Sequence, residues 1–183
     1  MNKFNVGNLL VADPFLNDIN FGRSVVILTE VSDNSAMGFI LNKPYSKKLN
    51  QLIDGVEHHQ FTIYKGGPVQ EDTLHFLHNR PDLIENGHKI CDSIFWGGDF
   101  ENALSLIKDG FLTPNDIRFF IGYSGWDKLQ LEEEFESNSW FLHSAKQHFV
   151  FHKNSQFLWK DVLLDMGGEF SKMVNYPIDP QLN

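Results

Sequence analysis

The segment that most constrains the fold is 23–29, with the sequence RSVVILT. Its aliphatic and β-branched residues do not alternate with polar ones, which is typical of a strand covered on both faces. Turn-forming residues follow at 32–35, and a second apolar segment, MGFIL, follows at 37–41. The two segments therefore predict a hairpin near the centre of a β-sheet.

Other segments predict further strands and helices around this hairpin. Asp99 is placed as an N-cap, and the helical spacing of Phe100, Ala103, Leu104 and Ile107 predicts a helix that ends near Gly110. Ser124 and Asp127 resemble a capping box before a helix at 127–136, whose four glutamates are typical of a solvated face. The remaining predictions are strands at 9–12, 61–64, 73–77 and 117–121, a hairpin of 140–142 with 149–151, and helices at 47–53 and 157–166.

The length of 183 residues predicts one domain, 1–183, with an irregular tail at 176–183. Seventeen Phe, four Trp and four Tyr supply enough large apolar surface for a substantial core. No repeat, linker or low-complexity tract divides the chain.

The net charge of −9, most of it in residues 92–183, argues against direct binding to DNA or to an anionic membrane. Cys91 is the one cysteine, so an intrachain disulfide is impossible and a reducing cytoplasm is expected. No segment resembles an export signal or a membrane span. The expected partners are a protein or a small anionic ligand.

Three sequence patterns resemble known catalytic, phosphate-binding or metal-binding motifs, but none matches fully. We therefore assign no catalytic residue, cofactor or metal from them. Gly122-Tyr123-Ser124-Gly125 resembles the nucleophile elbow of hydrolases, but Trp126 occupies the position that needs the second glycine. Gly66-Gly67-Pro68 lacks the Lys and Ser/Thr of a phosphate loop, so a tight turn is expected. The eight histidines show no metal-binding spacing with a carboxylate.

Arg23 is the most informative polar residue, because a guanidinium at the end of an apolar strand must reach water or find a partner. It is interpreted either as a ligand for a carboxylate or phosphate, or as part of a salt bridge to Asp13, Asp18 or Glu134. Asn42 has two interpretations as well: it binds a ligand, or it caps a turn before Lys43-Pro44.

Seven segments taken together resemble the YqgE/AlgH family of bacterial proteins over nearly the whole chain. They are NLLVADP, RSVVIL, AMGFILNKP, GGPV, LHFLH, IGYSGW and QLEEEFESNSW, in this order. The resemblance implies an α+β fold in which helices flank a strongly bent mixed β-sheet with barrel-like character. It also implies a cytoplasmic protein with no established enzyme activity, and some members are described as candidate transcriptional regulators.

The resemblance marks sixteen positions of this chain as characteristic of the family. Six are candidates for a ligand or partner site: Arg23, Ser24, Asn42, His78, Gln130 and Glu134. Ten are interpreted as structural: Gly38, Pro44, Gly66, Gly67, Pro68, Gly122, Tyr123, Trp126, Asn138 and Trp140. Ser124 stands where the family usually has alanine, and Lys43 stands where arginine is more usual, which weakens bidentate anion binding there.

Two functional hypotheses follow, and a structural interpretation stands beside them. The favoured hypothesis is a regulatory binding protein that acts indirectly, through a protein partner or a small ligand. The alternative is an enzyme whose site gathers Arg23, Asn42, His78 and Glu134, with His78 or Glu134 as the general base. Alternatively, most of the marked residues hold the fold, with glycines at tight turns and tryptophans in the core.

Overall fold

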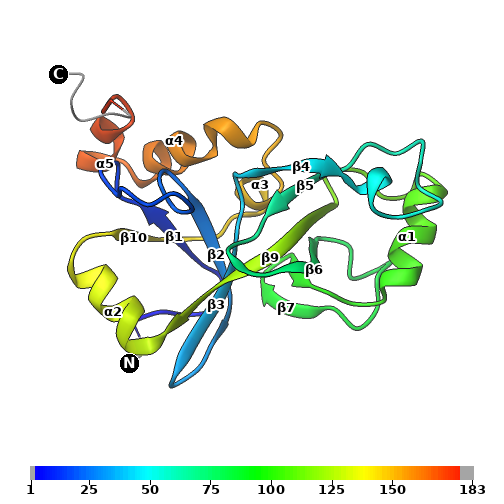
Figure 1. Cartoon of the computed structure of the whole chain (residues 1–183), viewed down its shortest axis with the longest axis horizontal. Coiled ribbons are helices and arrows are strands. Elements are labelled where there is room, and N and C mark those ends of the chain that lie inside the picture. Colours follow the sequence, from blue (N-terminus) through cyan, green and yellow to red (C-terminus); the bar gives the residue numbers. More distant parts are fainter. Residues whose placement is uncertain (1–2, 178–183) are drawn as a thin grey trace.

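A computed structural model describes residues 3–177, which form ten strands and five α-helices (Figure 1). The strands are β1 (Asn8–Ala12), β2 (Val25–Val31), β3 (Ser35–Ile40), β4 (Pro44–Lys48), β5 (Thr62–Lys65), β6 (Val69–His78), β7 (His88–Cys91), β8 (Ile94–Trp96), β9 (Ile117–Asp127) and β10 (Trp140–Ser144). The helices are α1 (Phe100–Lys108), α2 (Lys128–Glu136), α3 (Gln147–Val150), α4 (Ser155–Met166) and α5 (Gly168–Met173), and a 3-10 turn, η1, spans Leu49–Gln51.

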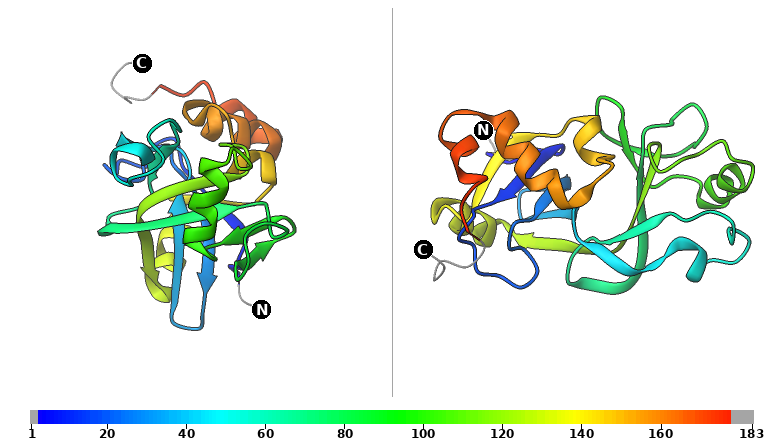
Figure 2. Two further views of the ribbon diagram at one scale, coloured as in Figure 1. Left: turned by 90° about the vertical axis from the view of Figure 1, so that its right-hand side faces the viewer. Right: turned by 90° about the horizontal axis from the view of Figure 1, so that it is seen from above.

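One curled sheet contains all ten strands, and β9 connects its parts. The main order is β10-β1-β2-β3-β9-β6-β8-β7, and β5 joins β4 to β9. The β5–β9 pair is parallel, whereas the other strand pairs are antiparallel. The strands bend out of a common plane and helices cover the sheet (Figure 2). The predicted α+β fold, a strongly bent mixed sheet flanked by helices, is confirmed.

The predicted central hairpin is β2 and β3. Residues 25–29 are buried, as expected for a strand with neighbours on both edges and cover on both faces. The turn at 32–35 is held by the Ser32 hydroxyl, which accepts hydrogen bonds from Asn34 N and Ser35 N. β2 begins at Val25, because Arg23 has a left-handed φ of 53° that no regular strand accommodates.

The helices bury their apolar faces in clusters on different parts of the sheet. Helix α4 contributes Leu158, Trp159 and Val162 to the cluster around β1 and β2, and α1 contributes Ala103 and Ile107 to the cluster at the other end of β9. The α1 prediction is confirmed in detail: Asp99 accepts a hydrogen bond from Asn102 N, and Gly110 follows the helix with a φ of 76°.

The structure corrects three local predictions. The hairpin of 140–142 with 149–151 is wrong, because β10 pairs with β1 and Phe149 lies in α3. The capping box is wrong, because Ser124 lies within β9. The segment 47–53 is partly strand, since β4 extends to Lys48 before η1, and the β7–β8 hairpin was not predicted.

The tail predicted to be irregular lies largely outside the described residues. Tyr176 and Pro177 belong to no helix or strand, and 178–183 fall beyond the described range. Within residues 3–177, no helix is long and apolar enough to cross a membrane.

Candidate functional site

The marked glycines lie where backbone segments approach too closely for a side chain. A Cβ added at Gly38 would lie 2.2 Å from the Ile27 carbonyl oxygen, and one at Gly66 would lie 2.2 Å from the Gly122 carbonyl oxygen. Gly67 approaches Tyr123 in the same way, and Gly122 has a φ of 66°. Because real Cβ atoms do not tolerate such contacts, these glycines make the junction of β3, β9 and the turn before Pro68 possible.

Ser124 stabilises this junction instead of acting as a nucleophile. Its buried hydroxyl donates to the Gly66 carbonyl oxygen at 2.9 Å, and Ile40 N donates to the same oxygen. Because the oxygen has two lone pairs, both bonds are possible at once. The serine hydroxyl, which an alanine would lack, therefore adds one hydrogen bond to the junction.

Four marked residues form one cluster centred on the Glu134 carboxylate. Trp126 Nε1 and Trp140 Nε1 donate to Oε2 at 3.0 and 2.7 Å, and Gln130 Nε2 donates to Oε1 at 2.9 Å. Both indoles are buried. The carboxylate thus satisfies two buried N–H groups and attaches α2 to β9 and β10. Asn138, with a left-handed φ of 60°, follows this helix.

Asn42 fixes the turn that contains Arg23. Its Oδ1 accepts a hydrogen bond from Val25 N at 3.0 Å, and its Nδ2 donates to the Arg23 carbonyl oxygen at 2.9 Å. Lys43 Nζ donates to the Gly22 carbonyl oxygen at 2.7 Å. The neighbouring Ser24 hydroxyl is buried and has no hydrogen-bond partner among the described residues. Asn42 therefore joins the backbone on both sides of Ser24 within this turn.

The Arg23 side chain is turned toward the end of the described chain. Its Nη2 donates to the Tyr176 carbonyl oxygen at 2.5 Å, and its guanidinium lies 4.8 Å from the centre of the Trp159 ring. The salt bridge to Asp13, Asp18 or Glu134 is not formed.

His78 is fully buried at the end of β6. Its Nδ1 accepts a hydrogen bond from Arg80 N at 3.2 Å, its ring stacks on Phe95, and its Nε2 has no partner among the described residues. Burial lowers the pKa of His78 and favours the neutral ring.

The two candidate general bases of the hypothetical enzyme site, His78 and Glu134, lie at opposite ends of β9. His78 is paired with Ile117 at one end of β9, whereas Trp126, which binds Glu134, lies at the other end. Trp126 is nine residue steps along the strand from Ile117, a path of about 30 Å. Figure 1 shows β9 running between the β6 and α2 regions. The fold therefore gives no evidence of a shared site for His78 and Glu134.

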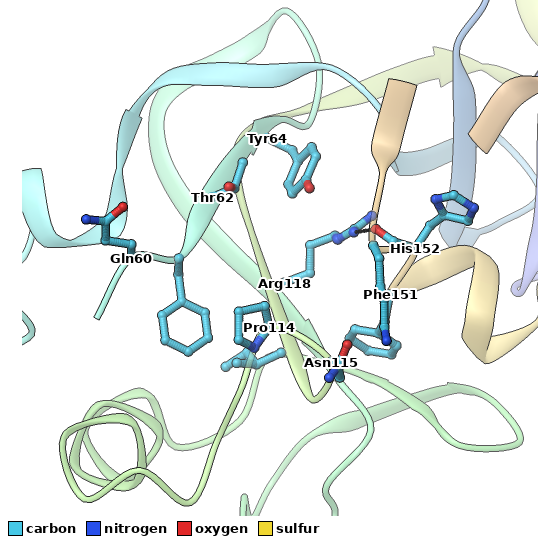
Figure 3. Close-up of a pocket in the computed structure, with 11 residues that line it drawn as sticks. Gln60, Thr62, Tyr64, Pro114, Asn115, Arg118, Phe151 and His152 are labelled. Carbon is cyan, nitrogen blue, oxygen red and sulfur yellow. Dashed lines mark hydrogen bonds between the residues drawn. The ribbon is translucent and has the colours of Figure 1, made fainter. Parts of the chain in front are cut away.

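A pocket beside the first residues of β9, Ile117 and Arg118, gathers polar groups (Figure 3). It has a volume of about 170 Å³ and lies between β5, the segment before β9, and the connection from α3 to α4. Its lining residues are Gln60, Phe61, Thr62, Tyr64, Pro114, Asn115, Ile117, Arg118, Phe151, His152 and Lys153. They include positively charged side chains and no Asp or Glu, although the chain carries a net charge of −9.

Arg118 is the central charged group of this pocket. The residue is only 5% exposed, and its guanidinium lies 4.3 Å from the centre of the Tyr64 ring. Nη1 donates to the Leu41 carbonyl oxygen at 3.1 Å and Nη2 to the His152 carbonyl oxygen at 2.5 Å. No carboxylate forms an ion pair with it within residues 3–177.

The chemistry of this arrangement favours an anion. Burial lowers the pKa of the Arg118 guanidinium, yet an arginine in a protein stays charged. A buried charge with only neutral acceptors is costly, and an anion in the pocket would offset that cost. Figure 3 shows Arg118 between Tyr64 and His152, within reach of the pocket.

The sequence analysis missed Arg118, although a signal was present. The pattern of IRFFI at 117–121 predicts a strand, and Arg118 stands inside it between apolar residues. The argument applied to Arg23, that a guanidinium in an apolar segment needs a partner, holds more strongly for Arg118, because Arg118 is itself buried whereas Arg23 is only partly buried.

The chain is similar to known proteins over nearly its full length. A family model described as AlgH-like matches residues 9–171. A UPF0301 protein of Cytophaga hutchinsonii is 42% identical, with 97% of this chain and 98% of that protein covered. One of Chlorobium limicola is 41% identical, with 99% and 97% covered.

Two solved structures share the fold. A protein of Corynebacterium diphtheriae has a TM-score of 0.82 at 20% identity, with 96% of this chain and 94% of that chain covered. The AlgH protein of Pseudomonas aeruginosa has a TM-score of 0.73 at 24% identity, with 97% of each chain covered. The family model and the two relatives show that this chain belongs to the YqgE/AlgH family.

Proposed function

We propose that this chain is a cytoplasmic regulatory protein that binds a small anionic ligand in the Arg118 pocket and acts through a protein partner. The observation that carries the proposal is Arg118 itself, a buried guanidinium whose described hydrogen-bond partners are two backbone carbonyl oxygens. The absence of acidic side chains among the lining residues supports it. The candidate anion site thus lies at Arg118, and Arg23 is occupied by its own turn and by Tyr176.

Anion titrations test this proposal directly. Purified protein is titrated with inorganic phosphate, sulfate and acetate, and backbone amide shifts are followed by NMR. We expect saturable shifts at the pocket residues, and we expect Arg118→Gln to abolish them. Arg80→Gln is the matched control, because Arg80 is a more exposed arginine paired with Asp82 outside the pocket. The absence of saturable shifts with all three anions would contradict the proposal.

A role in transcription, if this chain shares one with family members, would be indirect. The net charge of −9 opposes the release of counterions that drives binding to duplex DNA. We expect no binding of the purified protein to random duplex DNA at low ionic strength, measured by fluorescence anisotropy. Tight binding that weakens steeply with added salt would contradict this part of the proposal.

A further inference from the structure

We propose that the group bound beside Arg118 is a dianionic phosphate monoester, held by Arg118 together with Lys48 and Lys153. The inference rests on the proposed function and names the chemical class of its ligand. It follows from the number of cations at the pocket, the donors they present and the size of the space.

Three cationic side chains lie in or next to this pocket. Arg118 and Lys153 line it, and Lys48 Nζ reaches the lining residue Thr62, whose hydroxyl it approaches at 3.4 Å. A monocarboxylate is neutralised by one of these cations, whereas a phosphate monoester carries a charge of about −1.5 to −2 at neutral pH. The excess of positive charge therefore matches a dianion better than a monoanion.

The His152 ring is not assigned as a ligand for the anion. Its Nε2 is paired with Asp161 Oδ2 at 2.8 Å, and its Nδ1 accepts a hydrogen bond from Asn154 N. Both ring nitrogens are thus engaged outside the pocket. Asp161, the acid bound to this lining residue, is occupied by the imidazole.

Several donors remain for phosphate oxygens. Two of the five N–H groups of Arg118 bind Leu41 and His152, which leaves three. The Thr62 hydroxyl and the Asn115 carboxamide supply further donors (Figure 3). The ammonium of Lys153, another lining residue, adds one more. A phosphate presents three strong acceptor oxygens, so this set can satisfy it.

The volume limits what enters. Pockets for whole drug-sized ligands measure about 300–1,000 Å³, whereas this one measures about 170 Å³. The pocket therefore takes a head group, and the ester substituent would pass the exposed residues Pro114 and Asn115.

Methyl phosphate and dimethyl phosphate test the charge requirement, because they share their chemistry and differ in charge. At pH 8 the monoester is a dianion, since its second pKa is near 6, and the diester is a monoanion. We expect isothermal titration calorimetry or NMR to show binding of methyl phosphate at least about tenfold tighter than of dimethyl phosphate or acetate, a difference of about 1.4 kcal/mol.

The lysine variants test the assigned cations. Lys48→Gln and Lys153→Gln should each weaken methyl phosphate binding several-fold and reduce the preference over dimethyl phosphate. Lys172→Gln, on α5 and paired with Glu169, is the control and should change neither. Equal binding of the three probes would overturn this inference and leave the anion proposal standing. No binding of any probe would overturn both.

Discussion

Glu134 and Trp140 are joined by a 2.7 Å hydrogen bond from the indole Nε1 to carboxylate Oε2, and the same oxygen accepts from Trp126. The two indole rings meet edge to face, with centroids 6.0 Å apart. One carboxylate therefore holds two buried aromatic residues from different strands, β9 and β10, and the helix between them in one arrangement. Glu134 is a structural residue that sequence analysis could equally assign to catalysis.

Glu134→Ala should lower the free energy of unfolding by about 3 kcal/mol, because it leaves two buried indole N–H groups without acceptors. Glu134→Gln keeps one acceptor oxygen and should cost about 1 kcal/mol. Urea denaturation followed by tryptophan fluorescence measures both. Glu133→Ala, an exposed neighbour on α2, is the control and should stay close to wild type. A Glu134→Ala protein as stable as that control would contradict this structural role.

Gly66→Ala should be strongly destabilising for steric reasons. Its added Cβ would lie 2.2 Å from the Gly122 carbonyl oxygen, so the backbone of the junction must shift, at a cost of about 3 kcal/mol or more. Gly110→Ala provides the comparison, because Gly110 has a left-handed φ of 76° after α1 but open space around its Cβ position. That variant should cost only about 1–2 kcal/mol. Equal losses in thermal unfolding would show that crowding at Gly66 is relieved cheaply.

His78 should make the fold less stable as the pH falls. Its pKa in the folded protein is lowered from 6.5, chiefly by burial, while the charge of Asp82 acts in the opposite direction. The unfolded chain therefore takes up the proton first, and stability decreases as the pH falls below about 6.5. The free energy of unfolding is measured by urea denaturation at pH 7 and at pH values below about 6.5. We expect this free energy to fall less for His78→Gln than for wild type as the pH is lowered. The exposed His58→Gln is the control, and its profile should follow wild type.

The parts of the fold that could be predicted are those encoded by neighbouring residues. The apolar run of β2, the serine-rich turn after it and the capped α1 helix each carry their own signal. The partner of β10 could not be predicted, because Trp140 pairs with Ala12, which is distant in the sequence. The local pattern of 140–151 fits a hairpin equally well, but β10 pairs with β1 and Phe149 lies in α3.

In the candidate site, too, local features could be predicted and contacts between distant residues could not. The sequence indicates that Asn42 and Arg23 are polar residues at strand ends. It does not predict that they bind the carbonyl oxygens of Arg23 and Tyr176, respectively. Glu134 lies among four glutamates that resemble a solvated face, and its role depends on indoles from two separate strands. Arg118 acquires its pocket from β5 and the α3–α4 connection, which no local pattern places beside it.

Asn42→Asp should destabilise the fold and spare anion binding. The carboxylate can still accept from Val25 N, but it has no N–H for the Arg23 carbonyl oxygen, which would then face a negative charge. We expect a loss of about 2–3 kcal/mol in urea denaturation, the range for a buried group left unsatisfied. Arg23→Gln, which keeps the turn's backbone contacts, should lose less. A variant with wild-type stability and no phosphate binding would instead place Asn42 in a ligand site.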